Sequence, residues 1–334
     1  MRRQALVFAG PERAEVVDEA CPTPAPGELL IETRFSAISA GTELLAYRGQ
    51  LAPDLPLDET LSALTQGSFR FPFRYGYACA GVVTAVGSGV DATWRGRRVF
   101  SFAPHATAFV AKVDDVFAVP DAVSDEVAPL LASAETAVNL ALDGGPLFAE
   151  TVVVFGQGAV GLLLTAALAA FPLEALIAID KVSDRRAIAS RFGATAVGAA
   201  ADEARALVGA RGADLSYELS GNPALLDAAI AATGREGRVI VGSFYGTKSA
   251  PVELGGHFHR GRLRLVSSQV SHIGPALAAR WDRKRRMAAA WRLLGACDAA
   301  ALVGETIAFS DAPGAYERLA QGTAGAPQFL FKYN

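Results

Sequence analysis

The 334-residue sequence has few cysteines and no marked excess of charge. Its three cysteines, Cys21, Cys79 and Cys297, are far apart and form no C-x-x-C pair, which argues against a disulfide framework and a cysteine-rich zinc site. The 31 basic and 34 acidic residues leave a net charge of -3, so nothing indicates nucleic acid or an anionic membrane surface as a partner. We expect a cytoplasmic protein that acts on a small molecule.

Long hydrophobic runs are interrupted. The first ten residues contain two arginines and only a short apolar run, too little for the core of a signal peptide. Residues 151–179 are long and almost uncharged, but three glycines and Pro172 divide them into pieces of ordinary globular length. We therefore expect no membrane span.

The pattern of hydrophobic residues changes along the chain and predicts two domains. Residues 1–125 consist of short alternating segments between Gly, Pro and Asp, which indicates an irregular, mostly β region. In residues 126–269, apolar β-type runs alternate with Ala-rich helical runs, which favours an α/β doubly wound parallel sheet. Residues 270–334 contain a further helical run and end in an apolar segment that reads as a returning strand, so we expect them to complete the first domain.

The segment "VVVFGQGAVG" carries the strongest motif. Gly156, Gly158 and Gly161 form G-x-G-x-x-G after an apolar β run and at the start of a helical run. These glycines permit a tight turn, backbone approach to a pyrophosphate and close helix packing. Asp180 follows the next β run at the position where a carboxylate binds both ribose hydroxyls, which favours NAD(H) over NADP(H).

Basic residues after Asp180 leave NADP possible. Lys181, Arg185 and Arg186 can offset the repulsion between the carboxylate and a 2'-phosphate, or they can form a solvated helix start. We prefer NAD because the charge of Asp180 acts directly at the ribose.

The chain resembles the medium-chain dehydrogenase/reductase (alcohol dehydrogenase-like) superfamily over essentially its whole length, in "ISAGTELLAYRG", "YGYACAGVVTAVGSGV", "VVVFGQGAVG", "ELSGNP" and "GRVIVGSF". The resemblance implies a GroES-like, partly open β-barrel catalytic domain, a Rossmann dinucleotide-binding domain, a substrate cleft between them and a homodimer. It also implies cofactor contacts at Thr136, Gly156, Gly158, Val160, Gly161, Asp180, Arg185, Ser220 and Gly242.

The positions at which zinc-dependent members carry metal ligands are altered here. Ala40 stands where those members have a catalytic cysteine, Tyr77 stands at the histidine of their G-H-E triplet, and Ala132 and Ser133 stand near the third ligand. No cysteine-rich lobe follows "GRRVF". Because zinc prefers thiolate, imidazole or carboxylate ligands, we expect a zinc-free member.

Two other clusters have ordinary interpretations. His257 and His259 in "HFH" share a face if that segment is extended, but no third ligand follows at a fixed spacing. The basic segment "RWDRKRR" favours a solvated helix face, although Arg280 or Arg283 can reach an acidic substrate.

Without zinc, side chains must stabilise the substrate oxygen and move its proton. Tyr77 can donate a phenolic hydrogen bond, and His105, the sole histidine of residues 1–125, is a candidate proton shuttle. Glu43 and Glu135 lie in segments that the resemblance places at the cleft, where they can orient His105 or bind substrate. Packing or structural roles remain open for all four.

The function that these residues favour is a zinc-independent, NAD-preferring alcohol or carbonyl oxidoreductase. The segments "ISAGTE" and "GY" resemble those of the hydroxyethyl bacteriochlorophyllide dehydrogenases, which implies a place near that subgroup. The alternatives are an NADPH-dependent quinone or enone reductase, which Asp180 disfavours, and a dinucleotide-binding sensor without turnover.

Overall fold

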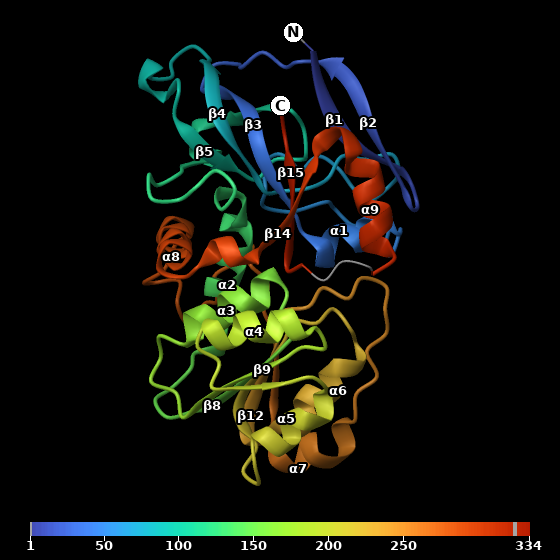
Figure 1. Ribbon diagram of the computed structural model, residues 1–334, viewed down its shortest axis with the longest axis vertical. Coiled ribbons are helices and arrows are strands. Elements are labelled where there is room, and N and C mark those ends of the chain that lie inside the picture. Colours follow the sequence, from blue (N-terminus) through green and yellow to red (C-terminus); the bar gives the residue numbers. More distant parts are fainter. Residues whose placement is uncertain (1, 323–325) are drawn as a thin grey trace. The chain divides into compact units, whose positions relative to one another are not determined.

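The computed structural model describes residues 2–322 and 326–334, which form two compact units (Figure 1). One unit combines Met1–Ala132 with Val303–Asn334, and the other is Ser133–Leu302. Both contain sheets with helices, as the predicted α/β class requires. Within the described ranges, no helix has the length and hydropathy needed to cross a bilayer.

The limits of the units differ from the domain boundaries expected at residues 125 and 269. Residues 270–302, expected to complete the first domain, cluster with the second unit. They contain helix α8 (Arg283–Ala296), whose Arg286 side chain donates to Glu135 Oε1 and Asn139 Oδ1 of helix α2 (Leu131–Gly144). This buried ion pair joins residues about 150 positions apart, a pairing that local sequence patterns do not reveal.

The first unit contains a seven-stranded sheet and a separate two-stranded one. Its strands are β1 (Arg2–Gly10), β2 (Arg13–Ala20), β3 (Glu28–Ile38), β4 (Cys79–Val86), β5 (Arg98–Ser101), β6 (Ala108–Lys112), β7 (Val116–Ala118), β14 (Val303–Ala308) and β15 (Gln328–Lys332), and its helices include α1 (Ala40–Tyr47) and α9 (Ala312–Ala320). The large sheet runs β14-β15-β3-β4-β5-β7, with β6 paired to β3. The predicted returning strand is thus confirmed: β15 lies between β14 and β3, with Phe331 opposite Ser36.

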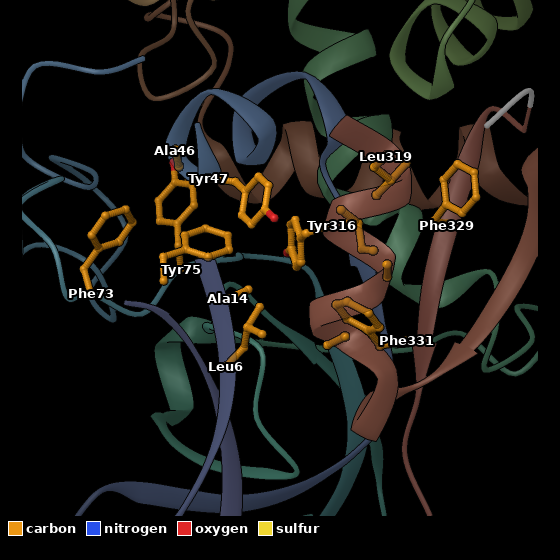
Figure 2. Packing of buried hydrophobic residues seen from close by; sticks show 14 of the residues in the cluster. Leu6, Ala14, Ala46, Tyr47, Phe73, Tyr75, Tyr316, Leu319, Phe329 and Phe331 are labelled. Atoms are coloured by element: carbon orange, nitrogen blue, oxygen red, sulfur yellow. The ribbon is translucent and has the colours of Figure 1, made fainter. Parts of the chain in front are cut away.

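The core of this unit is aromatic and joins its two chain segments (Figure 2). Tyr316 of α9 stacks on Tyr47 of α1 with ring centroids 5.5 Å apart, and its edge meets Phe8 of β1 at 5.1 Å. Offset and edge-to-face contacts of this kind add about 1 kcal/mol each beyond burial of apolar area. Residues 303–334 are therefore part of the core that supports α1.

The second unit is a six-stranded parallel sheet flanked by helices (Figure 1). Its elements are α2, β8 (Thr151–Phe155), α3 (Ala159–Leu168), β9 (Ala175–Ile179), α4 (Ser183–Arg191), β10 (Ala196–Gly198), α5 (Ala201–Leu207), β11 (Ala213–Glu218), α6 (Ala224–Ala232), β12 (Thr233–Val241), α7 (His259–Gly261), β13 (Arg264–Ser267) and α8. The strand order is β10-β9-β8-β11-β12-β13, the 3-2-1-4-5-6 order of a Rossmann fold. The chain reverses direction across the sheet between β8 and β11, where such folds bind ligands outside the carboxyl ends of the strands.

Tyr217 of β11 places a phenolic oxygen in the centre of this unit. The side chain is completely buried, and its hydroxyl has no hydrogen-bond partner among the residues described. It packs so closely on Gly144 of α2 that a Cβ there would lie 2.0 Å from the phenolic oxygen. An unpaired buried hydroxyl costs free energy that a phenyl ring does not.

We expect Tyr217→Phe to raise the free energy of unfolding by about 1 kcal/mol, because it removes a buried hydroxyl that lacks a partner. Tyr47→Phe is the matched control: its hydroxyl donates to the Glu12 carbonyl at 2.8 Å, so its loss should lower stability by a similar amount. Thermal and urea unfolding measure both. A lower melting temperature for Tyr217→Phe would contradict the assignment.

Candidate active site

The glycine loop follows β8 and requires glycine at two positions for steric reasons. Gly156 has φ +92°, and a Cβ on it would lie 2.7 Å from the backbone of Ser220. A Cβ on Gly161 would lie 1.9 Å from the Gly156 carbonyl oxygen, so the first turn of α3 packs directly on the loop. Gly158 caps α3 at φ −72°, and no described atom lies within 4 Å of its Cβ position. The helix N-terminus is therefore open at Gly158, as a phosphate-binding turn needs.

Asp180 follows β9 and is tied to the same loop. Its Oδ2 accepts the Gln157 backbone N–H at 2.7 Å, and its Oδ1 accepts that of Val182 at 2.9 Å. Arg185 Nη1 lies 4.0 Å from the carboxylate, and the Arg186 guanidinium donates to the Asp180 carbonyl oxygen. Each carboxylate oxygen keeps a further lone pair with which it can accept a ribose hydroxyl.

The other predicted cofactor positions that follow strands also lie at the carboxyl edge of the sheet. Ser220 follows β11, where its backbone N–H donates to the buried Glu218 carboxylate at 2.8 Å. Gly242 follows β12 and donates to the Glu218 carbonyl oxygen at 3.0 Å. Val160 is the second residue of α3 and is partly exposed beside Gly158. The residues around this edge fit a dinucleotide, because the open helix N-terminus at Gly158, the Asp180 carboxylate and small residues lie there.

In the first unit, Glu43 and His105 meet inside the barrel. Both side chains are buried, and His105 Nε2 lies 3.1 Å from Glu43 Oε2. Glu43 Oε2 also accepts the Tyr316 hydroxyl, and Oε1 accepts the Ser39 backbone N–H at 2.8 Å. Three donors therefore satisfy this buried carboxylate.

The other ring nitrogen of His105 extends the network. Nδ1 lies 2.7 Å from the Ser36 hydroxyl, which lies 2.7 Å from the Tyr333 hydroxyl. One set of donors satisfies every pair: the Tyr333 hydroxyl donates to Ser36 Oγ, the Ser36 hydroxyl donates to Nδ1, and Nε2–H donates to Glu43. Burial raises the pKa of Tyr333 well above its usual value, so this phenol stays a donor.

Tyr77 stands at the edge of this network. Its ring packs edge-on against Tyr75, with centroids 5.8 Å apart, and its hydroxyl donates to Ser39 Oγ at 2.5 Å. Burial and the charge of Glu43 raise the pKa of Tyr77 to about 12, although hydrogen bonds with Ser39 and Thr42 oppose the shift. Tyr77, Ser39 and Thr42 are each partly exposed, and their three hydroxyl groups gather where α1 begins.

Glu135 does not belong to this network, because its partner is Arg286 of α8. Its Oε1 accepts two N–H groups of Arg286, at 2.8 and 3.1 Å, and both side chains are buried. Burial raises the pKa of Glu135, although the charge of Arg286 opposes the shift. This pairing supports a structural role between α2 and α8, and the predicted role in the reaction stays a prediction. Thr136 is the next residue of α2 and is partly exposed.

The donor chemistry at the predicted metal positions does not fit zinc. Ala40, Tyr77 and Ala132 offer two methyl groups and a phenol, whereas zinc prefers thiolate, imidazole or carboxylate. Among residues 2–322 and 326–334, no three His, Cys, Asp or Glu side chains gather so as to hold a metal ion. The ring of His257, the other candidate, donates to the Thr233 carbonyl oxygen at 2.7 Å.

Comparisons with known proteins agree with this fold. A family model for zinc-binding dehydrogenases matches residues 159–287, less than half of the chain. Sorbitol dehydrogenase of Bacillus subtilis is 30% identical over 206 residues, which are 51% of this chain and 58% of that protein. 2-Desacetyl-2-hydroxyethyl bacteriochlorophyllide A dehydrogenase of Cereibacter sphaeroides is 27% identical over 285 residues, covering 80% of this chain and 82% of its own. A short chain alcohol dehydrogenase from Escherichia coli, solved with NADH, shares 18% identity and a TM-score of 0.79 over 99% of both chains.

These matches support the alcohol dehydrogenase-like superfamily for this chain, and the structural likeness confirms the predicted GroES-like and Rossmann folds. The chain spans 58% of the length of the sorbitol dehydrogenase. The family match lies within the second unit and includes none of Ala40, Tyr77 and Ala132, so its description does not bear on metal binding there. The pigment-synthesis subgroup stays a prediction, since relatives with other named activities also match this chain.

Sequence reasoning missed several members of the first-unit cluster. Ser39 and Thr42 flank Ala40 in "ISAGTE", so a signal for them exists: two hydroxyl groups stand beside the altered ligand position. Ser36 and Tyr316 carry no such signal, because long-range pairing alone brings them to His105 and Glu43.

We expect the glycines of the loop to respond differently to alanine. Gly161→Ala should lower the melting temperature and abolish dinucleotide binding, because its Cβ would meet the Gly156 carbonyl oxygen at 1.9 Å. Gly158→Ala should fold as the wild type does, since no described atom opposes its Cβ, yet bind NADH at least about tenfold more weakly because the methyl group occupies phosphate space. Thermal melts and NADH fluorescence titration measure both. Unchanged NADH affinity in Gly158→Ala would place the phosphates elsewhere.

Proposed function

We propose that this protein is an oxidoreductase that transfers a hydride between the nicotinamide of NAD(H) and an alcohol or carbonyl substrate. The observation that carries the proposal is the glycine loop after β8, held to the Asp180 carboxylate on a sheet with Rossmann strand order. The named dehydrogenases among its relatives support the same reaction class.

Asp180 favours NAD over NADP. Its carboxylate is fixed by two backbone N–H groups and faces the ribose position of this fold, where a 2'-phosphate would be repelled. Arg185 approaches the same carboxylate, which reduces its availability as a partner for a phosphate. NADP remains the alternative cofactor, and it would be the cofactor if the protein were a quinone or enone reductase.

We propose that the reaction is independent of zinc. The residues at the family's ligand positions are unsuited to the metal, and hydroxyl groups stand near two of them instead. The cofactor supplies or accepts the hydride when bound. Substrate oxygen would meet Tyr77, with Ser39 and Thr42 beside it.

Tyr77 would act as a hydrogen-bond donor. Because its pKa is about 12, the phenol keeps its proton at neutral pH and can stabilise negative charge that develops on a carbonyl oxygen. Ser39 Oγ accepts the hydrogen bond of the Tyr77 hydroxyl and so fixes its direction. The hydroxyl can exchange this hydrogen bond for one with the substrate. Such a preorganised donor is worth about 10²-fold to 10³-fold in rate.

This donor group requires a substrate with a polar oxygen that can lie beside the aromatic ring of Tyr77. A chlorin of the pigment-synthesis type stays a proposal that rests on partial motifs and one relative. We further propose a cytoplasmic location, which the three widely separated cysteines favour, and a homodimer, which the resemblance implies. A dinucleotide sensor without turnover is the second candidate, and NADH binding without oxidation across ketones, quinones and enones would favour it.

We expect Tyr77→Phe to lower kcat/KM for carbonyl reduction by about 100-fold, because it removes the hydroxyl that stabilises the substrate oxygen while keeping the ring. Tyr75→Phe is the matched control, since it changes the neighbouring buried ring in the same way and should leave turnover within about twofold. Steady-state kinetics with NADH and a panel of ketones and aldehydes measures both. Full activity in Tyr77→Phe would move the site elsewhere.

We expect Asp180→Ser to raise the ratio of NADPH to NADH affinity by at least about tenfold, because it removes the carboxylate that repels a 2'-phosphate and that Arg185 approaches. Asp184→Asn, which neutralises an exposed acid in the first turn of α4, is the control and should leave the ratio unchanged. Fluorescence titration with both cofactors decides. Tighter NADPH than NADH binding by the wild type would overturn the NAD preference itself.

A further inference from the structure

We infer that His105 and Glu43 are positioning residues that hold Tyr77 in place, and that His105 does not shuttle protons to substrate. The inference rests on the proposed function in taking Tyr77 as the group that meets the substrate oxygen. It assigns a different role to the histidine that the sequence marks as a proton shuttle.

The first observation is that both ring nitrogens of His105 have buried hydrogen-bond partners. Its ring is completely buried, with Glu43 on Nε2 and Ser36 on Nδ1. Phe331 of β15 meets the ring edge-on, with centroids 5.2 Å apart. A proton shuttle needs a path from the reacting atom to the ring, and here both nitrogens are occupied by buried partners.

The second observation links the ring to the Tyr77 backbone. Gly76 has φ +101°, and a Cβ on it would lie 2.4 Å from His105 Cδ2, so the glycine packs directly against the imidazole. The His105 backbone N–H also donates to the Tyr75 carbonyl oxygen at 3.2 Å. His105 therefore contacts the two residues that precede Tyr77 and sets the course of the chain there.

The third observation links Glu43 to the Tyr77 hydroxyl. Glu43 Oε1 accepts the backbone N–H of Ser39, and Ser39 Oγ accepts the phenolic proton of Tyr77. The Glu43 carboxylate thereby holds Ser39, and Ser39 in turn holds the Tyr77 hydroxyl. Tyr77 is held from both ends, its backbone by His105 and its hydroxyl through Glu43.

The groups around His105 also form a Ser-His-Glu series like that of a hydrolytic triad. Ser36 is completely buried, and its hydroxyl is occupied by His105 and Tyr333. A nucleophile must reach its substrate, so this arrangement serves structure and not acyl transfer. The burial of Ser36 agrees with a network that holds the surrounding side chains in position.

The test compares two substitutions at His105. His105→Gln keeps a donor near Nε2 and fills the space over Gly76, but it cannot titrate near neutral pH. We expect it to retain kcat within about fivefold and the shape of the pH profile of kcat/KM, whereas His105→Ala should lower kcat/KM by about 100-fold, as loss of a well-placed donor does. A loss of 100-fold in His105→Gln together with one limb of the pH profile would overturn the inference in favour of a shuttle.

A double-mutant cycle separates positioning from a general structural effect. If His105 acts through Tyr77, His105→Ala should cost little further activity in a Tyr77→Phe background, because the hydroxyl it positions is already gone. Additive losses would overturn the inference. Thermal melts identify variants that fail to fold, and His272→Ala, at an exposed histidine, is the control that should change nothing.

Hydrogen exchange tests the positioning without turnover. We expect His105→Ala to speed amide exchange in residues 39–43 and 74–79 relative to wild type, and His105→Gln and His272→Ala to leave it unchanged. Unaltered exchange in His105→Ala would overturn the inference. Because this readout needs no substrate, it stands even if the protein proves to be a sensor, and the two proposals fail separately.

Discussion

The first unit depends on one buried carboxylate. Glu43 accepts hydrogen bonds from Ser39, Tyr316 and His105, which belong to the start of α1, to α9 and to the segment before β6. A buried carboxylate without such donors costs several kcal/mol, so the hydrogen bonds of Glu43 hold these three segments together. The hydroxyl groups at the start of α1, and Tyr77 with them, take their places from this constraint.

The second unit could be predicted in detail because its information is local. The apolar run before Gly156 is β8, the Ala-rich run after it is α3, and Asp180 follows β9 as the spacing indicated. The first unit was predicted only in outline. Helix α1 lies in a region expected to be mostly β, and α9 was not foreseen, because both are stabilised by contacts between residues about 270 positions apart.

The candidate site shows the same division. Tyr77 was recognisable by its place at an altered ligand position, His105 as the sole histidine of residues 1–125, and Glu43 as an acid in a segment expected at the cleft. Their partners were not recognisable: Tyr333 is 297 positions from Ser36, and the Gly76 contact with the imidazole depends on a positive φ. The pairing of Glu135 with Arg286 was equally hidden, and it links helices α2 and α8. The residue types indicated which side chains could take part in a reaction, whereas the long-range hydrogen bonds show which partners each of them has.

The division of the first unit between two stretches of chain has a consequence for biosynthesis. Residues 133–302 form one contiguous stretch, whereas the sheet of the first unit lacks β14 and β15 until the last part of the chain has been made. Until then the β3 edge that receives β15 is unpaired, and Ser36 lacks Tyr333. Nascent chains therefore carry an open strand edge through much of translation, a state in which chaperones that shield such edges would matter most.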